Sequence, residues 1–438
     1  MDQDATAVPA TMLGLAGFVV LAAGEVGGEL ELLVETTETV TGCPGCGVVA
    51  TAHARRDHLV RDVPAGSRPV VLVWRKRIWR CHEVLCPRGT WTESTTAVRP
   101  RSTLTERARA WACRRVGRDG DTVAAVSREL GVGWNTVMRA VRDHGQPLVE
   151  DPARLDGVTG LGVDEHVWQH AAPGRRTQLA TGVVDLTPDR PPRLLEVVQG
   201  RTGKVYADWL AEQEQAWRDQ IRTVALDPFR GYATALCCQL PDAVRVLDAF
   251  HVVKLANTVV DEVRRRVQQT TLGHRGYRDD PLYTVRRLLR RGAEHLTERQ
   301  RAKVQAALQA GDPRFEVTVA WHAAQAVRAV YHADTPTEGR RQAGQLLESL
   351  PTCPIAEVAR LGRTLRAWRT EFLAYFHTTG VSNGPTEAMN LLIEKIRRVG
   401  HGYRNFDNYR LRLLLHCGLT WQTPPTPRIR SRRPRLVA

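Results

Sequence analysis

The sequence has no hydrophobic run long enough to cross a membrane. The apolar stretch from Met12 to Ala23 is only 12 residues long, is interrupted by glycines, and has no basic segment before it. A membrane-spanning helix needs about 20 apolar residues and a secretory signal needs a basic start, so we expect this stretch to be neither. Hydrophobic residues make up 42% of the chain and charged residues 25%, which is the balance of a globular protein.

Lysine is scarce, because 57 of the 62 basic residues are arginine. The formal net charge is +15, and the last 30 residues contain no Asp or Glu. A GC-rich genome is an alternative explanation for the arginine excess, but it does not explain the positive balance. The charge therefore predicts a polyanionic partner, and the composition of residues 423–438 predicts a disordered basic tail.

The cysteines are too scattered for a disulfide framework. Of the nine cysteines, four form two close pairs and five are dispersed, unlike the even, closely spaced set of a small secreted domain. We therefore expect the protein to work in a reducing cytoplasm, in association with the nucleoid. There is no internal repeat, and a chain of 438 residues is expected to hold two to four domains of roughly 150 residues each.

The two cysteine pairs have the spacing of metal ligands. They are Cys43-Pro-Gly-Cys46 and Cys81-His-Glu-Val-Leu-Cys86, and the 34 residues between them are expected to form a β-hairpin. Four thiolates satisfy tetrahedral Zn²⁺, and tight glycine turns direct backbone N–H groups at the sulfurs. The pattern predicts a zinc ribbon within a β-rich domain of residues 1–100, whose zinc ligands are Cys43, Cys46, Cys81 and Cys86. Replacement of one ligand by His82 and a set of unligated core thiols are the alternatives.

Residues 101–150 have helical character. Apolar residues recur at helical spacing in two segments on either side of Gly131, which predicts a helix-turn-helix at residues 121–142 within a DNA-binding domain. The second helix is expected to face bases and phosphates through Asn135, Thr136, Arg139 and Arg142. Any short helical hairpin has a similar pattern, which is the alternative, but the neighbouring cysteine pairs and the basic balance favour DNA binding.

Segments of strand and helix character alternate over residues 155–254. Their order is three strands, helix, strand, helix, strand, with the first helix expected around Tyr206–Trp217, and it predicts an RNase H-like fold. Residues 255–377 are mostly helical, which predicts an all-α insertion. Residues 378–422 are expected to return to the RNase H-like core as C-terminal helices. The predicted fold class is thus multidomain α/β.

Two acids follow β-rich runs of this core. Asp164 follows Val158–Val163, and Asp227 follows Ile221–Leu226, so each is expected at or near the end of a hydrophobic strand. An acid placed there contributes little to packing, but it can hold a divalent cation together with a carboxylate from a neighbouring strand. A single Asp is more often a loop cap. The pair on adjacent strands favours a metal site.

A third acid, Glu387, lies in the segment Ser382-Asn-Gly-Pro-Thr-Glu-Ala-Met-Asn390. Capping residues and a proline place Glu387 in the first turn of a helix. The alternative is an acid that is favoured there only by the helix dipole. Lys395 and Arg398, further along the same helix, are expected DNA contacts. Three carboxylates suffice to hold two Mg²⁺ or Mn²⁺ ions about 4 Å apart, the arrangement used in phosphodiester transfer.

These segments together resemble the ISL3 family of bacterial insertion-sequence transposases over most of the chain. The matching segments are Cys43–Cys46, Gly162-Val-Asp-Glu-His166, Ala225-Leu-Asp-Pro-Phe-Arg-Gly-Tyr232, Val246-Leu-Asp-Ala-Phe-His-Val-Val-Lys254, and Ser382–Asn390 running on to Gly402-Tyr-Arg-Asn-Phe406. The resemblance implies a DDE triad of Asp164, Asp227 and Glu387, catalytic Mg²⁺, and the inverted-repeat ends of an insertion sequence as substrate. Asp248 lies in a matching segment and ranks below the triad, as a residue behind the ligands or an alternative ligand.

Two other functions remain as alternatives to an active transposase. A DNA-binding regulator would use only the zinc ribbon and the helix-turn-helix, and it would not need the long second half. A degenerate transposase would keep the fold without activity, although all three acids are present. For the transposase we expect terminal repeats and target DNA as partners, no membrane partner, and a homodimer or higher oligomer on DNA. Residues 1–150 alone are expected to bind the ends.

Overall fold

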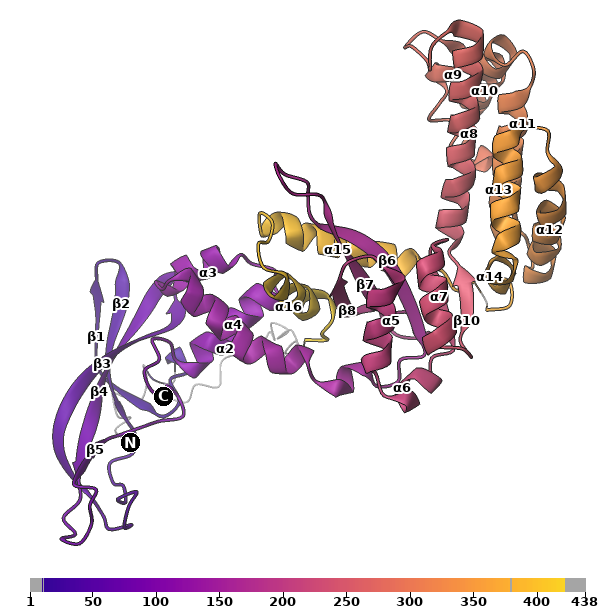
Figure 1. The fold of residues 1–438 in the computed structure, drawn as a ribbon. Coiled ribbons are helices and arrows are strands. Elements are labelled where there is room, and N and C mark those ends of the chain that lie inside the picture. Colours follow the sequence, from indigo (N-terminus) through magenta and orange to yellow (C-terminus); the bar gives the residue numbers. More distant parts are fainter. Residues whose placement is uncertain (1–9, 11, 379, 422–438) are drawn as a thin grey trace, which may run out of the picture. The chain divides into compact units, whose positions relative to one another are not determined.

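A computed structural model describes residues 10, 12–378 and 380–421 (Figure 1). The chain divides into two compact units. The first contains the residues up to Asp151 together with the chain from Ile396 onward, and the second contains Pro152–Lys395. The predicted tail at residues 423–438 lies outside the described residues. Within the described ranges, no helix is both long and apolar enough to cross a membrane.

The first unit contains a five-stranded sheet. Its strands are β1 (Phe18–Val26), β2 (Glu29–Thr36), β3 (Thr51–Ala65), β4 (Arg68–Arg80) and β5 (Thr90–Thr92). The order is β1-β2-β4-β3 with β5 paired to β4, and only the β2–β4 pair is parallel. β3 and β4 form the hairpin expected between the cysteine pairs. Gly66 and Ser67 at its turn have φ of 56° and 65°, the left-handed backbone that suits the twist of a tight hairpin.

Four helices of eight residues or more lie wholly within the part of the first unit that the structure describes. They are α2 (Glu106–Gly117), α3 (Val123–Leu130), α4 (Trp134–Val149) and α16 (Phe406–Cys417). The side chains of Thr105 and Thr122 cap α2 and α3 by accepting hydrogen bonds from backbone N–H groups, which satisfies donors that a helix start leaves unpaired. Gly131 ends α3 with φ of 65°, a conformation that glycine adopts without strain. α3 and α4 are therefore joined by the short turn expected of a helix-turn-helix.

Helix α16 packs closely against α2 and α4. A side chain at Gly117 or Gly145 would place its Cβ 2.9 Å from atoms of Leu415, so these two glycines make room for the buried leucine. The Arg412 guanidinium donates hydrogen bonds to the carbonyl oxygens of Gly120 and Asp121, at 3.3 and 2.8 Å. The last helix is thus part of the helix-turn-helix unit.

This packing differs from the expectation that residues 378–422 return to the RNase H-like core. From Ile396 onward the chain belongs to the first unit, because leucines of α16 are buried against α2 and α4. Sequence periodicity shows that a helix has an apolar face, but it does not show which partner that face covers. A front end of residues 1–150 alone therefore lacks part of its own core.

The second unit is built on a mixed five-stranded sheet. Its strands are β6 (Gly160–Gln169), β7 (Gln178–Asp185), β8 (Arg193–Gln199), β9 (Thr223–Leu226) and β10 (Val244–Leu247). The order is β10-β9-β6-β7-β8, in which β6, β7 and β8 are antiparallel, while β9 and β10 run parallel to β6. This confirms the predicted order of strands and helices. The helix expected around Tyr206–Trp217 is in fact interrupted, since α5 ends at Glu212 and α6 begins at Gln215.

Helices cover this sheet and extend from it (Figure 1). Those within the core are α5 (Gly203–Glu212), α6 (Gln215–Asp219), α7 (Arg230–Gln239) and α15 (Gly384–Val399). The helical insertion contains α8 (Ala249–Leu272), α9 (Pro281–Thr284), α10 (Glu298–Gly311), α11 (Glu316–Ala329), α12 (Pro336–Ser349), α13 (Ala356–Ala367) and α14 (Arg369–Ala374). Short 3₁₀ turns occur at Pro152–Leu155, Ala293–His295, Val330–His332 and Leu350–Thr352. Buried residues of the sheet and of the insertion form one hydrophobic cluster, which anchors the insertion on the core.

Candidate metal centre and DNA-binding surface

The register of the parallel strands places three acids in one row. Gly162 of β6 pairs with Ala225 of β9. Asp164 follows Gly162 by two residues, and Asp227 follows Ala225 by two residues. Leu226 of β9 in turn pairs with Leu247 of β10, so Asp248, directly after β10, lies level with Asp227, directly after β9. Because adjacent parallel strands run in the same direction with the same rise per residue, the three acids lie next to one another at the same edge of the sheet.

Asp164 lies within β6 rather than at its end, which corrects the sequence expectation. β6 continues to Gln169, because residues beyond Asp164 still pair with β7. One carboxylate oxygen of Asp164 accepts a hydrogen bond from the backbone N–H of Glu165, at 2.7 Å. The other accepts one from the Asn390 side chain of α15, at 2.6 Å. The helix that carries Glu387 therefore also orients Asp164.

The start of α15 is tied to the sheet by Asn383. Its side-chain amide donates to the carbonyl oxygen of Val163, at 3.1 Å, and its backbone N–H donates to Asp248, at 2.7 Å. A Cβ at Gly162 would lie 2.2 Å from the Thr386 hydroxyl oxygen, so only glycine at this position of β6 admits the helix. These contacts bring Glu387, in the first turn of α15, to the row of acids.

Asp248 is fully buried and caps α8. It accepts hydrogen bonds from the backbone N–H of His251, at 3.0 Å, and from His251 Nδ1, at 2.9 Å. His251 Nδ1 also lies 2.9 Å from Asp227 Oδ1. His251 is not among the site residues predicted from the sequence. An Asp that caps a helix with a His three residues later puts both side chains on one face of the first turn, and this spacing is the signal that would have found it.

Ligand atoms of these residues gather in two overlapping groups. Asp164, Asp227 and His251 form one group, and Asp248, His251 and Glu387 form the other. Within each group the ligand atoms lie within 4.8 Å of one another, and His251 belongs to both. The three acids predicted from the sequence, together with Asp248, thus lie around one site.

Several acidic side chains lie close together at this site, and their charges shift the pKa values of the site residues. Burial, together with the nearby charge of Asp227, raises the pKa of Asp164 to about 7. Burial and the charge of Asp248 also raise the pKa of Glu387. Burial alone would lower the pKa of His251, but its hydrogen bonds to Asp227 and Asp248 raise it to about 10. A cation at the site would relieve the repulsion between these carboxylates.

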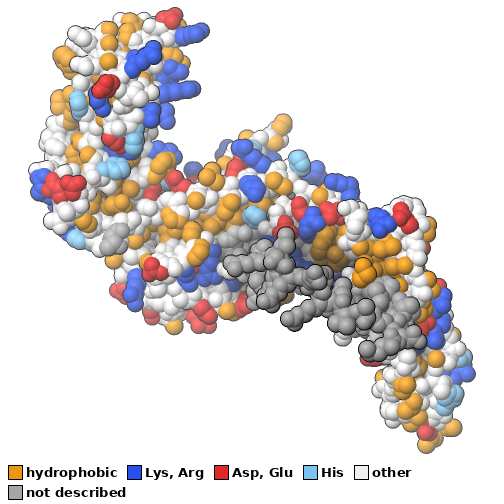
Figure 2. All heavy atoms as spheres, turned by 180° about the vertical axis from the view of Figure 1, so that it is seen from behind, with side chains coloured by type: hydrophobic (Ala, Val, Ile, Leu, Met, Phe, Trp, Pro, Cys, Tyr) orange, Lys and Arg blue, Asp and Glu red, His pale blue; other side chains and the backbone are white. Residues whose placement is uncertain are grey.

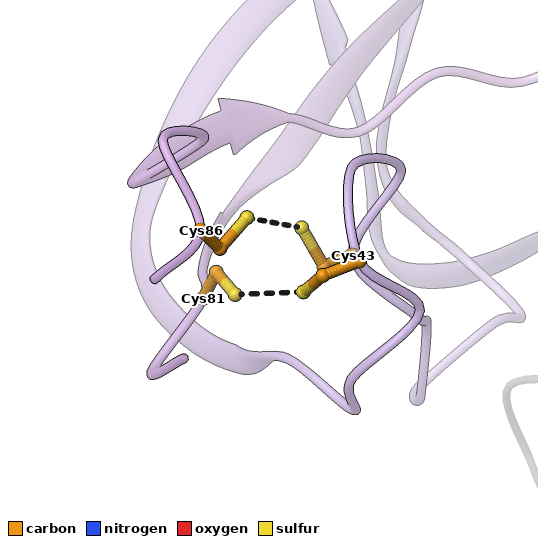
Figure 3. Close-up of side chains that lie close together, drawn as sticks. Cys43, Cys81 and Cys86 are labelled. Carbon is orange, nitrogen blue, oxygen red and sulfur yellow. Dashed lines mark hydrogen bonds between the residues drawn. The ribbon is translucent and has the colours of Figure 1, made fainter. Parts of the chain in front are cut away.

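The four predicted cysteine ligands converge in the first unit (Figure 3). Cys43 Sγ lies 3.7 Å from Cys86 Sγ, and Cys46 Sγ lies 3.5 Å from Cys81 Sγ. Zn–S bonds of about 2.3 Å in a tetrahedron imply sulfur separations of roughly 3.8 Å, whereas bonded disulfide sulfurs lie about 2.0 Å apart. The arrangement therefore fits a tetrahedral metal ion.

The alternative ligand His82 lies outside the cysteine group. Its Nε2 is instead 2.7 Å from the hydroxyl oxygen of Thr51. Backbone N–H groups support the sulfurs, since the Gly45 N–H donates to Cys43 Sγ at 3.4 Å. Burial acts to raise the pKa of Cys43, but backbone hydrogen bonds from Gly45 and Cys46 outweigh it and lower the pKa to about 7. A thiolate at this position is suited to bind a metal.

The helix-turn-helix presents most of its predicted contacts to solvent. On α4, Asn135 and Arg139 are exposed and Thr136 is half-buried. Arg142 is exposed, but its guanidinium donates hydrogen bonds to the Asn408 side chain of α16, at 2.8 and 3.2 Å. Lys395 and Arg398, on α15, are exposed.

A hollow of about 560 Å³ lies beside the start of α4. Arg128 of α3, Trp134 of α4 and Arg404 line it, and Trp134 is 45% exposed. Arg404 belongs to the segment that leads into α16. The position of this segment beside the helix-turn-helix was not predictable from local sequence patterns, because the two parts are far apart in the chain.

Three family profiles match the chain. One described as a transposase, of the ISL3 DDE type, matches residues 161–413. A helix-turn-helix domain of transposase family ISL3 matches residues 93–145, and a zinc finger of the transposases of IS204, IS1001, IS1096 and IS1165 matches residues 39–86. The order of the three matches confirms the predicted zinc ribbon, helix-turn-helix and catalytic core.

The chain is 26% identical over 394 residues to the transposase for insertion sequence element IS1001 of Bordetella parapertussis, covering 88% of this chain and 91% of that protein. The Drosophila P element transposase strand transfer complex is similar at a TM-score of 0.40 and 9% identity, covering 72% of this chain and 92% of that one, which is too low to bear on fold or function. The transposase profile alone spans more than half of the chain. The protein therefore belongs to the ISL3 family of DNA transposases.

Proposed function

We propose that Asp164, Asp227 and Glu387 are the catalytic carboxylates of this transposase. The observation that carries the proposal is that these three acids converge from two adjacent parallel strands and the start of one helix. Their ligand atoms belong to two groups, and His251 is a member of both groups. The three acids come from distant parts of the sequence, and specific contacts by Asn383 and Asn390 hold them together. Such a set of contacts is expected where side-chain positions matter for chemistry.

The residues fit a pair of Mg²⁺ or Mn²⁺ ions. All four acids offer hard oxygen donors, which these ions prefer. Asp227 Oδ1 is buried and lies 2.9 Å from His251 Nδ1, and a metal ion bound there would add to or replace that cationic partner. Bound metal ions would activate the attacking oxygen and stabilise the leaving oxygen of a phosphodiester. Asp164, Asp227 and Glu387 would hold them.

Asp248 has a different role in this proposal. Both of its carboxylate oxygens already accept hydrogen bonds, one from Asn383 and the other from His251. These bonds outweigh the effect of burial and lower the pKa of Asp248. Asp248 would therefore act as a positioning residue, which fixes His251 and the start of α15 relative to the sheet.

The substrate in this proposal is the inverted-repeat end of an insertion sequence, with target DNA joined to it afterwards. Asn135, Thr136 and Arg139 of α4, of which Asn135 and Arg139 are exposed, would contact bases and phosphates in the major groove. One Zn²⁺ held by the four cysteines would stabilise the neighbouring knuckles. We further propose that the chain acts on nucleoid DNA in the cytoplasm as a homodimer or higher oligomer, because two ends must be cut and joined together.

Substitution of the triad tests the proposal. Glu387→Gln keeps the size of the side chain but removes one metal-coordinating charge, so we expect Mg²⁺-dependent cleavage of a labelled terminal-repeat duplex to be lost. Binding of that duplex should stay within about twofold of the unsubstituted chain, since a group used only in the transition state changes turnover rather than affinity. Asp164→Asn and Asp227→Asn should behave alike.

Glu348→Gln is the matched control, because Glu348 lies on α12 with a side chain that is 67% exposed. It should cleave at the rate of the unsubstituted chain. Cleavage by Glu387→Gln at that same rate would show that the triad is assigned wrongly. Absence of cleavage by the unsubstituted chain in both Mg²⁺ and Mn²⁺ would instead favour a degenerate transposase.

A further inference from the structure

The helical insertion carries an arginine-rich surface that the catalytic site does not use. Figure 2 shows Lys and Arg side chains along one edge of this helical body. We call the surface the basic tip and define it by the exposed residues Arg265, Arg275, Tyr277, Arg278, Arg287 and Arg290. They come from the end of α8, the loop after it, and the segment that follows α9.

The loop between α8 and α9 is held in place by packing. Gly276 has φ of 119°, and a Cβ there would lie 2.8 Å from the Tyr283 ring and 2.9 Å from the Gln268 side chain. The loop backbone therefore lies directly on α8 and α9. Asp280 accepts hydrogen bonds from the Tyr277 N–H, at 2.5 Å, and from the Gln268 side chain, at 3.2 Å. With its backbone fixed, the loop directs Arg275, Tyr277 and Arg278 outward.

Two parts of the basic tip meet in one hollow. Arg265 and Arg266 of α8 line it together with Arg275 of the loop. Glu262 is the acid at its edge, and it is paired with Arg360 of α13. Arg265 is paired with Asp261, and Arg266 with Glu316 and Glu357, so the unpaired positive charge at this hollow comes from Arg275 of the loop.

Most arginines of the basic tip lack an acidic partner. Residues 273–303 contain nine basic and four acidic side chains. Within the described residues, no ion pair involves Arg275, Arg278, Arg287 or Arg290. The other side of the insertion differs, because Arg341 and Arg369 each pair with a glutamate of α12. Unpaired like charges repel one another, so four exposed and unpaired arginines within residues 275–290 suit a polyanion.

We propose that the basic tip is a second DNA-binding surface of this transposase, separate in sequence from the helix-turn-helix. The arginine side chains would contact phosphates, for which their planar forks are suited. Tyr277 is 67% exposed between two arginines of the loop. An exposed aromatic ring in that setting can stack on an unpaired base at a cut or frayed end. The proposal rests on the family assignment as a transposase, and not on the identity of the catalytic acids.

The test removes charge from the basic tip of the full-length chain. We expect Arg275→Ala/Arg278→Ala to weaken binding to terminal-repeat and scrambled duplexes by the same factor. The slope of log affinity against log salt, measured by anisotropy between about 50 and 200 mM salt, should fall by roughly 2, because each lost phosphate contact removes about 0.9. Arg287→Ala/Arg290→Ala should lower the slope by a similar amount.

The matched control is Arg341→Ala/Arg363→Ala, which removes two exposed arginines from α12 and α13. Its salt slope should equal that of the unsubstituted chain. A tip variant whose slope changes no more than that of the control would overturn the proposal. Discrimination between terminal-repeat and scrambled DNA should persist in the tip variants, since phosphate contacts carry no sequence information.

Two further measurements identify which DNA the basic tip holds. If the tip binds target DNA, the tip variants should cut donor ends normally but join them poorly to a plasmid. If it binds the flank of the transposon end, cutting should fall as well. Tyr277→Ala should weaken binding to an end with a single-stranded overhang by roughly fivefold or more, and Tyr277→Phe should restore it. Equal binding by Tyr277→Ala and the unsubstituted chain would remove the stacking role.

Discussion

The four thiols of the cysteine cluster face one another across two turns that have little apolar packing of their own. We therefore expect purified protein to contain one Zn²⁺ per chain, and Cys46→Ser to lose it, because three thiolates and a hydroxyl bind zinc far more weakly. Metal analysis by mass spectrometry measures the stoichiometry. Cys238→Ser, at an exposed cysteine outside the cluster, is the control and should keep its zinc. Full zinc content in Cys46→Ser would exclude the four-cysteine site.

Residue types and local spacing predicted most of the proposed site. The cysteine pairs were recognisable because their spacing is short, and the two aspartates because each follows a β-rich run of its own strand. The position of Asp164 inside β6 was not predictable, since β6 extends past it only through pairing with β7. Likewise, the contacts of Asn383 with Val163 and Asp248 depend on tertiary structure that no local pattern encodes.

At the scale of elements, the packing of α16 makes a quantitative prediction. Leu415 is fully buried against Gly117 and Gly145, so Leu415→Ala should lower the free energy of unfolding of the first unit by about 2–5 kcal/mol. Hydrogen exchange of the amides of α2 and α4 measures this unit separately from the rest. Leu148→Ala on α4, at a leucine that is 43% exposed, should cost less than about 1 kcal/mol. Equal protection in the two variants would contradict the packing.

The order of elements was predictable to a larger extent than their boundaries and partners. Alternating strand and helix character gave the succession β6, β7, β8, α5, β9, α7 and β10. The break between α5 and α6 was missed, because Trp209 and Trp217 pack edge to face across it and continue one apolar pattern through two short helices. The partner of α16 was missed for a related reason, since its buried leucines suit any apolar surface.

At the scale of the whole molecule, the first unit is discontinuous in sequence. A chain that stops after Lys395 keeps all three acids of the proposed triad but lacks α16. We expect it to bind terminal-repeat duplex at least tenfold more weakly than the full chain, because the helix-turn-helix loses its packing partner. Anisotropy with circular dichroism on the same samples measures both binding and folding.

A chain that stops after Trp421 is the control, because it keeps α16 and lacks the basic tail. Its discrimination between terminal-repeat and scrambled DNA should match that of the full chain. If the chain that stops after Lys395 binds as tightly as this control, then α16 is dispensable for DNA binding. The helix-turn-helix would in that case fold without it.

The discontinuity of the first unit also bears on the timing of synthesis. More than 250 residues separate the end of α4 from the start of α16, and a ribosome needs roughly 13 to 50 seconds to add them. During that interval, Leu415 has not yet been synthesised, so it cannot pack against Gly117 and Gly145. A nascent chain, or a product of premature termination, therefore does not possess a finished DNA-binding unit. Incomplete translation products would not compete with the intact transposase for the ends of the element.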